Sequence, residues 1–502
     1  MSTQFSFPPR SSRGSVLGFT WGQIFLVVAG VIVGVFGINV LAAGHPWGAG
    51  ALFAAALAVM SLGLLRLRGR RITEWLPIVV GALLQRGTRQ DRYRGALFAP
   101  HAVADHPDFP GPAAGYRWLT ALASDGLTEV GLLHHRGERT VTAALCCSGG
   151  NFILADTSVQ TQRLVDWANL LNILGTEYTG QGLVRWSLMA RAVPDLGNRA
   201  QRYLINRAVD TTTPAYRSLA QLTAAAAPTA QRHEVYLVTV WDTARMSGEI
   251  ADAGGSDQAI AAVVVDRLGG VAAAVAEAGV TTHGWLTTRG YAAVLRTQFD
   301  PDDQAVIDLR ATTDTLAAGV TPRMAGPAAA ETVGWSCYRH DSGISQTLWV
   351  YEMPRRPVGL TWLTPLFTRT SSRRTVTLTA QPVPEALAQL AARREKVATA
   401  GDEITKRRLR LVRTAREDEE ARAVEQIDRE QAAGHVRHRY CLLVTVTSTS
   451  AEQLGGEVRA VKRILSRTGC AAVVLAGEQD QAFAAGALPL GRGLKPMRGW
   501  LA

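Results

Sequence analysis

The longest apolar stretch of the chain lies near its amino terminus. From Gly14 to Leu65 there is no Asp, Glu, Lys or Arg. At about 1.5 Å of helical rise per residue, this length crosses a hydrocarbon core of about 30 Å twice. A Gly-His-Pro-Trp turn at 44–47 divides the stretch. The pattern therefore predicts a short tail over 1–20 and a transmembrane helical hairpin over 21–65.

Positive charge flanks this stretch on both sides. Arg10 and Arg13 precede it, and the turn between the helices carries no arginine or lysine. Four arginines follow the stretch directly, namely Arg66, Arg68, Arg70 and Arg71. Because cytoplasmic flanks of membrane helices are rich in Arg and Lys, both ends of the chain are predicted in the cytoplasm, in a two-pass protein of the inner (plasma) membrane. A cleaved signal peptide is the alternative, but it leaves the second apolar helix unexplained.

Aromatic and basic residues indicate where the chain meets the lipid. Trp21 and Trp47 stand near the starts of the two predicted helices, and tryptophan favours the membrane interface. The segment 66–95 has apolar residues, Trp75 among them, largely on one side of a helix with arginines at its ends. This pattern predicts a basic juxtamembrane helix that contacts anionic headgroups. A buried helix of the soluble body is the alternative.

The remaining chain alternates between a hydrophobic period of two and one of 3.6 residues. Region 96–230 contains a predicted hairpin that turns at 136–138, then a helix and a strand. Two later regions, within 231–382 and 434–502, each read as strand, helix, strand and helix, and the first adds further strands. Such units commonly place helices on one face of a sheet, so we expect an α+β body of repeated units. Chance similarity of the two stretches is the alternative.

A charged segment separates these regions at 383–433. From Arg393 to Gln431 there are eleven basic and ten acidic residues, with only a thin apolar stripe. This composition predicts a long solvated helical arm. Its basic block includes Arg407, Arg408 and Arg410, which we expect to dock an assembly partner. An ordinary exposed arm is the alternative.

The net charge of +11 does not by itself indicate nucleic-acid binding. Ten Arg against one Glu and one Asp give +8 for residues 1–95, so only +3 remains for the rest of the chain. Direct DNA binding would require a one-sided basic stripe over 393–416, and acidic residues follow that block immediately. The five cysteines show no disulfide or zinc spacing and are predicted to be reduced packing residues.

No catalytic or cofactor motif is found in the sequence. None of the four lysines follows Gly or precedes Ser or Thr, so a Walker A phosphate loop is excluded. The motifs GxSxG, HExxH and CxxC are also absent. His134 and His135 alternate across a predicted strand, and His435 with His438 lacks further ligands nearby. We therefore expect a protein without enzymatic activity, metal or cofactor; a membrane-anchored enzyme is the alternative if the fold forms a polar pocket.

Several strings along the chain resemble one family. They are RGRRITEWLPIVVGALLQRGTRQDRYRG, QRHEVYLVTV, HGWLTTRGYAAVLRTQFDP, QPVPEALAQLAARREK and GEQDQAFAAGALPLGRGL. Together with the apolar hairpin, they are similar to the PrgI-like/conjugal-transfer integral membrane family of actinobacteria over nearly the whole chain. That resemblance implies a type IV secretion-like membrane subunit joined to the non-ATPase part of a conjugation ATPase. A weaker likeness is to EccE of type VII secretion.

The resemblance implies partners but no catalytic residues. The expected partners are membrane lipids, a separately encoded secretion or conjugation ATPase, and other inner-membrane subunits or copies of this chain. The predicted function is that of a membrane-anchored structural component of a secretion or conjugative DNA-transfer apparatus. An EccE-like component of a type VII secretion complex is the alternative.

Overall fold

The computed structural model describes residues 4–5, 7, 21–64, 66–67, 70–95, 107–150, 152–195, 198–226, 230–313, 318–393, 397, 401 and 415–494. The fold is mixed α+β with an apolar helix pair near the amino terminus, which confirms the predicted class at that level. The chain forms two compact units. One, the anchor unit, comprises Phe7–Arg89 and Pro384–His435; the other, the body, comprises Met1–Ser6, Gln90–Val383 and Val436–Ala502.

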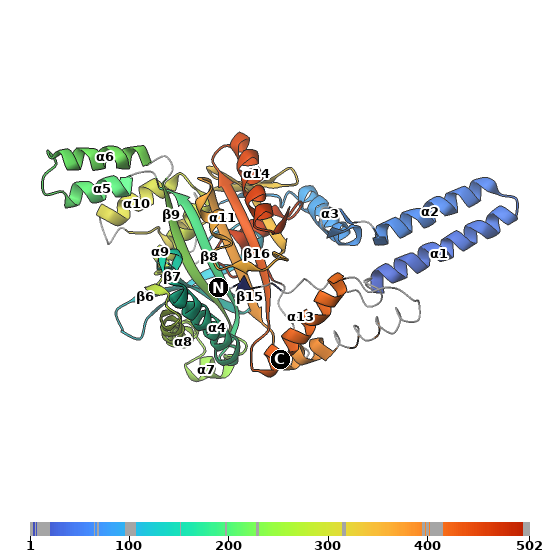
Figure 1. The fold of residues 1–502 in the computed structure, drawn as a ribbon, viewed down its shortest axis with the longest axis horizontal. Coiled ribbons are helices and arrows are strands. Elements are labelled where there is room, and N and C mark those ends of the chain that lie inside the picture. Colours follow the sequence, from blue (N-terminus) through green and yellow to red (C-terminus); the bar gives the residue numbers. More distant parts are fainter. Residues whose placement is uncertain are drawn as a thin grey trace. The chain divides into compact units, whose positions relative to one another are not determined.

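The anchor unit begins with two long antiparallel helices (Figure 1). They are α1 (Trp21–Ala42) and α2 (Pro46–Leu64), joined at Gly44, whose φ of 83° suits glycine. A short antiparallel pair follows, formed by β2 (Arg66–Leu67) and β3 (Arg70–Arg71). Next comes α3 (Ile72–Gly87); after the body's first part the chain returns to this unit, where α13 (Ala415–Ala432) is described.

The body is built on one antiparallel sheet of thirteen strands. The order along its main path is β4 (Arg92–Arg94), β11 (Ala329–Val333), β12 (Cys337–His340), β13 (Gly343–Glu352), β16 (His438–Ser448), β15 (Arg373–Pro382), β8 (Leu183–Pro194), β9 (Gln231–Asp242), β7 (Thr140–Ser148), β6 (Glu129–His135) and β5 (Tyr116–Leu122). Off this path, β10 (Thr281–Trp285) pairs with β7 and β17 (Ala471–Val474) pairs with β13. A separate pair joins β1 (Gln4–Phe5) to β14 (Val358–Gly359).

The centre of the sheet is the pair β8–β15 (Figure 1). Their register runs from Arg374 opposite Ala192 to Ala380 opposite Trp186. On one side β9 follows β8, and on the other side β16 follows β15. The two sides of the sheet correspond strand by strand. Outward from the centre, one side runs β8, β9, β7, β6 and β5, with β10 paired to β7. The other side runs β15, β16, β13, β12 and β11, with β17 paired to β13, so strands in corresponding places also follow each other in the same order along the chain.

Helices cover both faces of the sheet. On β9, Leu237 and Trp241 join one apolar cluster, whereas Tyr236 and Val238 join another on the opposite face. The first face is covered by α4 (Thr157–Gly180) and α8 (Asp257–Glu277), and the second by α9 (Thr288–Phe299) and α15 (Gln479–Gly486). A third cluster lies between β16 and α14 (Ala451–Arg467) and shares Leu378 with the first, so α14 covers the same face as α4 and α8.

The expectation of helices on a single face is therefore wrong. The central strands are buried on both sides over most of their length, as the burial of six successive residues in β7 and seven in β16 shows. A sheet with two apolar faces needs cover on both. Local signals set the helix starts, because Ser256, Thr287 and Ser450 accept N-cap hydrogen bonds at α8, α9 and α14.

Shorter helices complete the structure. They are α5 (Asn198–Arg207), α6 (Pro214–Ala226), α7 (Ser247–Asp252), α10 (Asp303–Thr313) and α11 (Thr364–Thr368). The helices α5 and α6 form a hairpin in the part of the chain that connects β8 to β9 (Figure 1). The predicted hairpin turning at 136–138 is β6–β7, in which Arg139 takes a positive φ of 55°.

Candidate functional site

The first candidate site is the surface of the helix pair α1–α2. Three helices of the described chain are long and apolar enough to cross a membrane: α1, α2 and α8. Half of α8 is buried, and Val264, Leu268 and Val271 of this helix pack into the body. The spans in α1 and α2 are only 11% and 17% buried. Their apolar side chains point outward, a distribution that suits lipid rather than water.

The two helices pack closely where glycines of α1 face α2. A Cβ added to Gly30 would lie 2.5 Å from Met60 Cγ, and one added to Gly37 would lie 3.2 Å from the Phe53 ring. Ala56, opposite Gly30 and Gly34, is buried. Small residues let helix backbones approach closely in a membrane, where van der Waals packing drives association. The outward face carries large residues, such as Phe36 and Leu57, exposed by 62% and 72%.

The predicted lipid-contact residues fall around this pair. Trp47 lies in the first turn of α2 and is 93% exposed, and Trp21 is the first residue of α1. Arg66 is paired with Arg71 in the β2–β3 ladder, and Arg70 is paired with Leu67, so the backbone brings these arginines together directly after α2. Arg68 lies outside the described residues.

The predicted lipid-contact residue Trp75 lies on α3, a strongly apolar helix, and is half-buried. Leu76, Val80, Leu83 and Leu84 are all exposed, and their spacing places them along one side. Sequence reasoning anticipated the amphipathic pattern but not the β2–β3 pair that separates α3 from α2.

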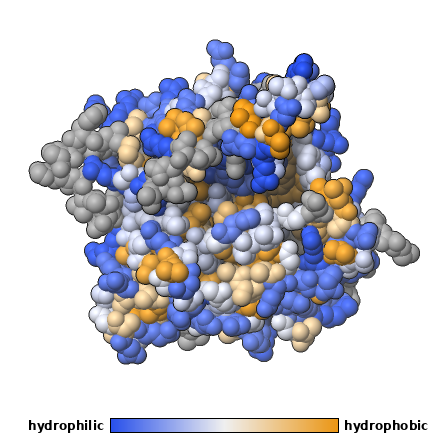
Figure 2. All heavy atoms as spheres, turned by 90° about the vertical axis from the view of Figure 1, so that its left-hand side faces the viewer, coloured by the Kyte–Doolittle hydropathy of each residue, from blue (hydrophilic) through white to orange (hydrophobic). Residues whose placement is uncertain are grey.

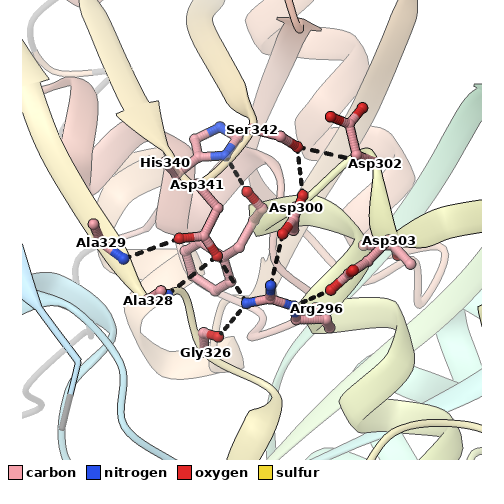
Figure 3. Close-up of polar contacts among 12 residues, drawn as sticks. Arg296, Asp300, Asp302, Asp303, Gly326, Ala328, Ala329, His340, Asp341 and Ser342 are labelled. Atoms are coloured by element: carbon pink, nitrogen blue, oxygen red, sulfur yellow. Dashed lines mark hydrogen bonds and ion pairs between the residues drawn. The ribbon is translucent and has the colours of Figure 1, made fainter. Parts of the chain in front are cut away.

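The second candidate site is a polar junction around Arg296 at the end of α9 (Figure 3). The guanidinium donates from Nε to Asp303 at 2.6 Å, from Nη1 to Asp341 at 2.7 Å and from Nη2 to Asp300 at 2.6 Å. Nη1 also donates to the Gly326 carbonyl. Asp341 in turn accepts hydrogen bonds from the backbone of Ala328 and Ala329. The junction thus joins α9, α10, the start of β11 and the β12–β13 turn.

Electrostatics in this junction follow from burial and pairing. Burial opposes the charge of Arg296, but the three carboxylates outweigh it and raise the pKa of the guanidinium. Burial also raises the pKa of Asp341, although its two backbone donors and Arg296 favour the carboxylate. Four of the five N–H groups of Arg296 are used within the protein. The arrangement therefore holds elements together and leaves the guanidinium little capacity for a ligand.

His340 lies beside this junction and is fully buried. Its Nδ1 is 2.7 Å from the Phe299 carbonyl and its Nε2 is 2.7 Å from Ser345 Oγ, which lies 2.7 Å from Thr447 Oγ1. A neutral ring fits these partners, with Nδ1–H donating to the carbonyl and Nε2 accepting from the hydroxyl. Burial lowers the pKa of His340 to about 4.

A second buried charge network lies where the last residues of β8 pair with the first residues of β9. Arg191 is 2% exposed and donates to Glu234 at 3.0 Å and to Thr297 at 2.9 Å. Arg232 pairs with the same glutamate and with Asp308. Burial opposes ionisation of Glu234, but the two arginines outweigh it, so its pKa is lowered. Sequence patterns did not reveal this network, because its members lie on four elements, β8, β9, α9 and α10, and only the fold brings them together.

The other predicted chemistry is accounted for by packing. His134 Nδ1 lies 3.4 Å from Arg117, whereas the His135 ring packs edge-on against Tyr116. The five cysteines form no disulfide, and burial raises the pKa of Cys147 to about 11, which disfavours a reactive thiolate. Among the described residues no group of three or more His, Cys, Asp or Glu is placed to hold a metal ion.

One surface cavity of about 380 Å³ lies between β14, α11 and α14. Its charged lining consists of Arg369 and Arg467, with Trp362 and Ile464 on the apolar side. Arg369 and Arg467 stand at the carboxyl ends of α11 and α14, where helix dipoles favour cations. Their placement is thus explained by the helix ends themselves.

Replacing Arg296 tests whether the junction stabilises the fold. In Arg296→Met, Asp341 and Asp300 lose their cation, so we expect the free energy of unfolding to fall by about 3 to 5 kcal/mol in urea titration of the detergent-solubilised protein. The exposed Arg323→Met is the matched control, with an expected change within about 0.5 kcal/mol. Equal effects of the two substitutions would contradict this assignment.

His340 should make the protein sensitive to acid. Its pKa is about 4 when folded and near 6.5 when unfolded, so the unfolded state binds more protons between these values. The free energy of unfolding should therefore fall by up to about 3 kcal/mol from pH 7 to pH 4 on account of this group. His340→Gln should flatten the pH dependence in this window, whereas the exposed His283→Gln should not. An unchanged slope in His340→Gln would count against a buried neutral ring.

Comparison with protein-family models and with curated proteins finds no match to this chain. The resemblances to the conjugal-transfer family and to EccE therefore stay predictions.

Proposed function

We propose that the protein is a membrane-anchored, non-enzymatic component of a secretion or conjugative DNA-transfer apparatus. The observation that carries the proposal is the helix pair α1–α2, in which glycines of α1 face α2 while large apolar residues such as Phe36 and Leu57 face outward. In water this surface would favour aggregation, and in a bilayer it is the expected lipid face. The rest of the chain supplies a large folded body joined to this anchor.

The arginines after α2 support a cytoplasmic location of the body. Three of the four flanking arginines lie in the β2–β3 pair immediately after the second helix. The backbone ladder lies where the chain leaves the apolar helices, and arginines at this place in the chain suit anionic headgroups at the cytoplasmic surface. The exposed apolar side of α3 supports an interfacial helix rather than a buried one.

The role proposed for the body is assembly. Two of its buried charge networks are paired internally: Arg296 with three aspartates, and Arg191 and Arg232 with Glu234. A separately encoded ATPase is the proposed partner, in line with the missing phosphate loop of this chain. Arg407, Arg408 and Arg410, the predicted docking residues, lie outside the described residues, and their role stays a prediction. The repeated-unit description of the body is likewise a proposal, supported by the matching strand order on the two sides of β8–β15.

An EccE-like role in type VII secretion is the alternative within the same class. Both roles use two apolar helices and a soluble body. The neighbouring reading frames discriminate between them, because a detached P-loop ATPase supports conjugation and small WxG-type substrates support type VII secretion.

Truncation tests the anchor. A chain that begins at Gln90 should remain in the supernatant after ultracentrifugation of cell extract, whereas the full chain should stay in the membrane pellet after a high-salt wash, because apolar insertion is insensitive to salt. A chain that begins at Arg66 keeps the flanking arginines and α3, and high salt should weaken its membrane binding because salt screens the attraction of the arginines to anionic headgroups. Retention of the Gln90 chain in the high-salt pellet would refute the helix pair as the main attachment.

A further inference from the structure

The hairpin α5–α6 is a separately built projection of the body. Its base is closed where β8 meets β9, with Pro194 opposite Gln231 and Asp195 N donating to the Ala230 carbonyl. Its turn is fixed by Asp210, which accepts from Thr212 N and Oγ1 at 2.7 and 2.6 Å. The strand pair thus closes the base of the hairpin, and the local bonds of Asp210 shape its turn.

Apolar and basic residues share the surface of this hairpin. The exposed apolar side chains are Tyr203, Ile205, Val209, Leu219 and Leu222, and α6 has no buried residue. Between 198 and 226 there are four arginines and one aspartate, giving a net charge of +3. Figure 2, which views the molecule from the side of this hairpin, shows apolar patches among hydrophilic surface. An exposed surface of this composition is typical of an interface.

The helix α13 carries the opposite charge and lies between β15 and β16 in the chain, as the α5–α6 hairpin lies between β8 and β9. From 415 to 432 this helix has seven acidic residues and three arginines, a net charge of −4. Since β8 and β15 are antiparallel neighbours, the chain leaves the sheet for the two insertions at opposite ends of this pair, at Pro194 and at Pro382.

We propose that the α5–α6 hairpin of one copy binds the acidic helix α13 of a second copy. Opposite charge sets the register and the association rate, and the apolar residues of the hairpin are buried in the contact. Val424 and Ile427 supply apolar side chains on α13, where both are partly buried. The contact joins different surfaces of the two copies, so its repetition produces a ring or a linear array. It deepens the proposed assembly role and rests on it.

Crosslinking of two singly substituted chains tests the contact. Val209→Cys places a thiol at the fully exposed hairpin turn, and Glu425→Cys places one on exposed α13. In neutral detergent, a mixture of the two full-length variants should form a crosslinked dimer with a bismaleimide, whereas each variant alone and the unsubstituted chain should form little. No dimer in the mixture, over a hundredfold range of protein concentration, would overturn the proposal.

Charge reversal identifies the surfaces. Arg207→Glu with Arg217→Glu on the hairpin chain should reduce the crosslinked fraction about tenfold, and Glu419→Arg with Glu430→Arg on the α13 chain should restore it. Arg459→Glu with Arg463→Glu, on the exposed side of α14, is the matched control and should have no effect. If the crosslinked fraction does not change with the α13 substitutions, or if crosslinking occurs only when anionic lipid is present, the hairpin binds a ligand other than α13. Because membrane attachment is measured by sedimentation, this contact and the anchor can fail independently.

Discussion

The backbone pairing of β8 with β15 is the constraint on which the body depends. These strands join β9 and the strands beyond it to β16 and the strands beyond it. Without this ladder each side would end in an open edge with unpaired N–H and C=O groups, which costs free energy when buried and invites aggregation in water. The pairing also determines that the two insertions leave the sheet at opposite ends.

Buried polar networks make the elements around this sheet specific. Arg296 can satisfy three carboxylates only if α9, α10 and the β12–β13 turn adopt one arrangement. Arg374, 1% exposed, similarly donates to the backbone carbonyls of Leu366, Phe367, Thr370 and Ser372, and so anchors the end of α11 to β15. Such groups are costly when unpaired, so they penalise alternative packings. The buried arginines of this body therefore serve to hold its elements in one arrangement.

Sequence patterns predicted the elements better than their packing. The charge-free stretch predicted a helical hairpin over 21–65 with a turn at 44–47, and α1 (Trp21–Ala42) and α2 (Pro46–Leu64) confirm these two helices, because long uninterrupted apolar runs are a strong signal. The mixed α+β class followed from the changing period. Helices on both faces were missed because Val and Thr alternate at 444–447 of β16, a pattern typical of a strand with one polar face, although Thr445 and Thr447 are in fact buried. The Arg296 and Arg191 networks could not be predicted, since they join residues brought together only by the tertiary fold.

The orientation of the α1–α2 turn tests the account most directly. His45 is exposed in this turn, and the arginines after α2 predict that the turn faces away from the cytoplasm. In intact cells, His45→Cys should be labelled by a membrane-impermeant thiol reagent, whereas the unsubstituted chain, whose five cysteines all belong to the body, should be labelled only after lysis. Labelling of His45→Cys only after lysis would contradict a hairpin that crosses the membrane with its body in the cytoplasm.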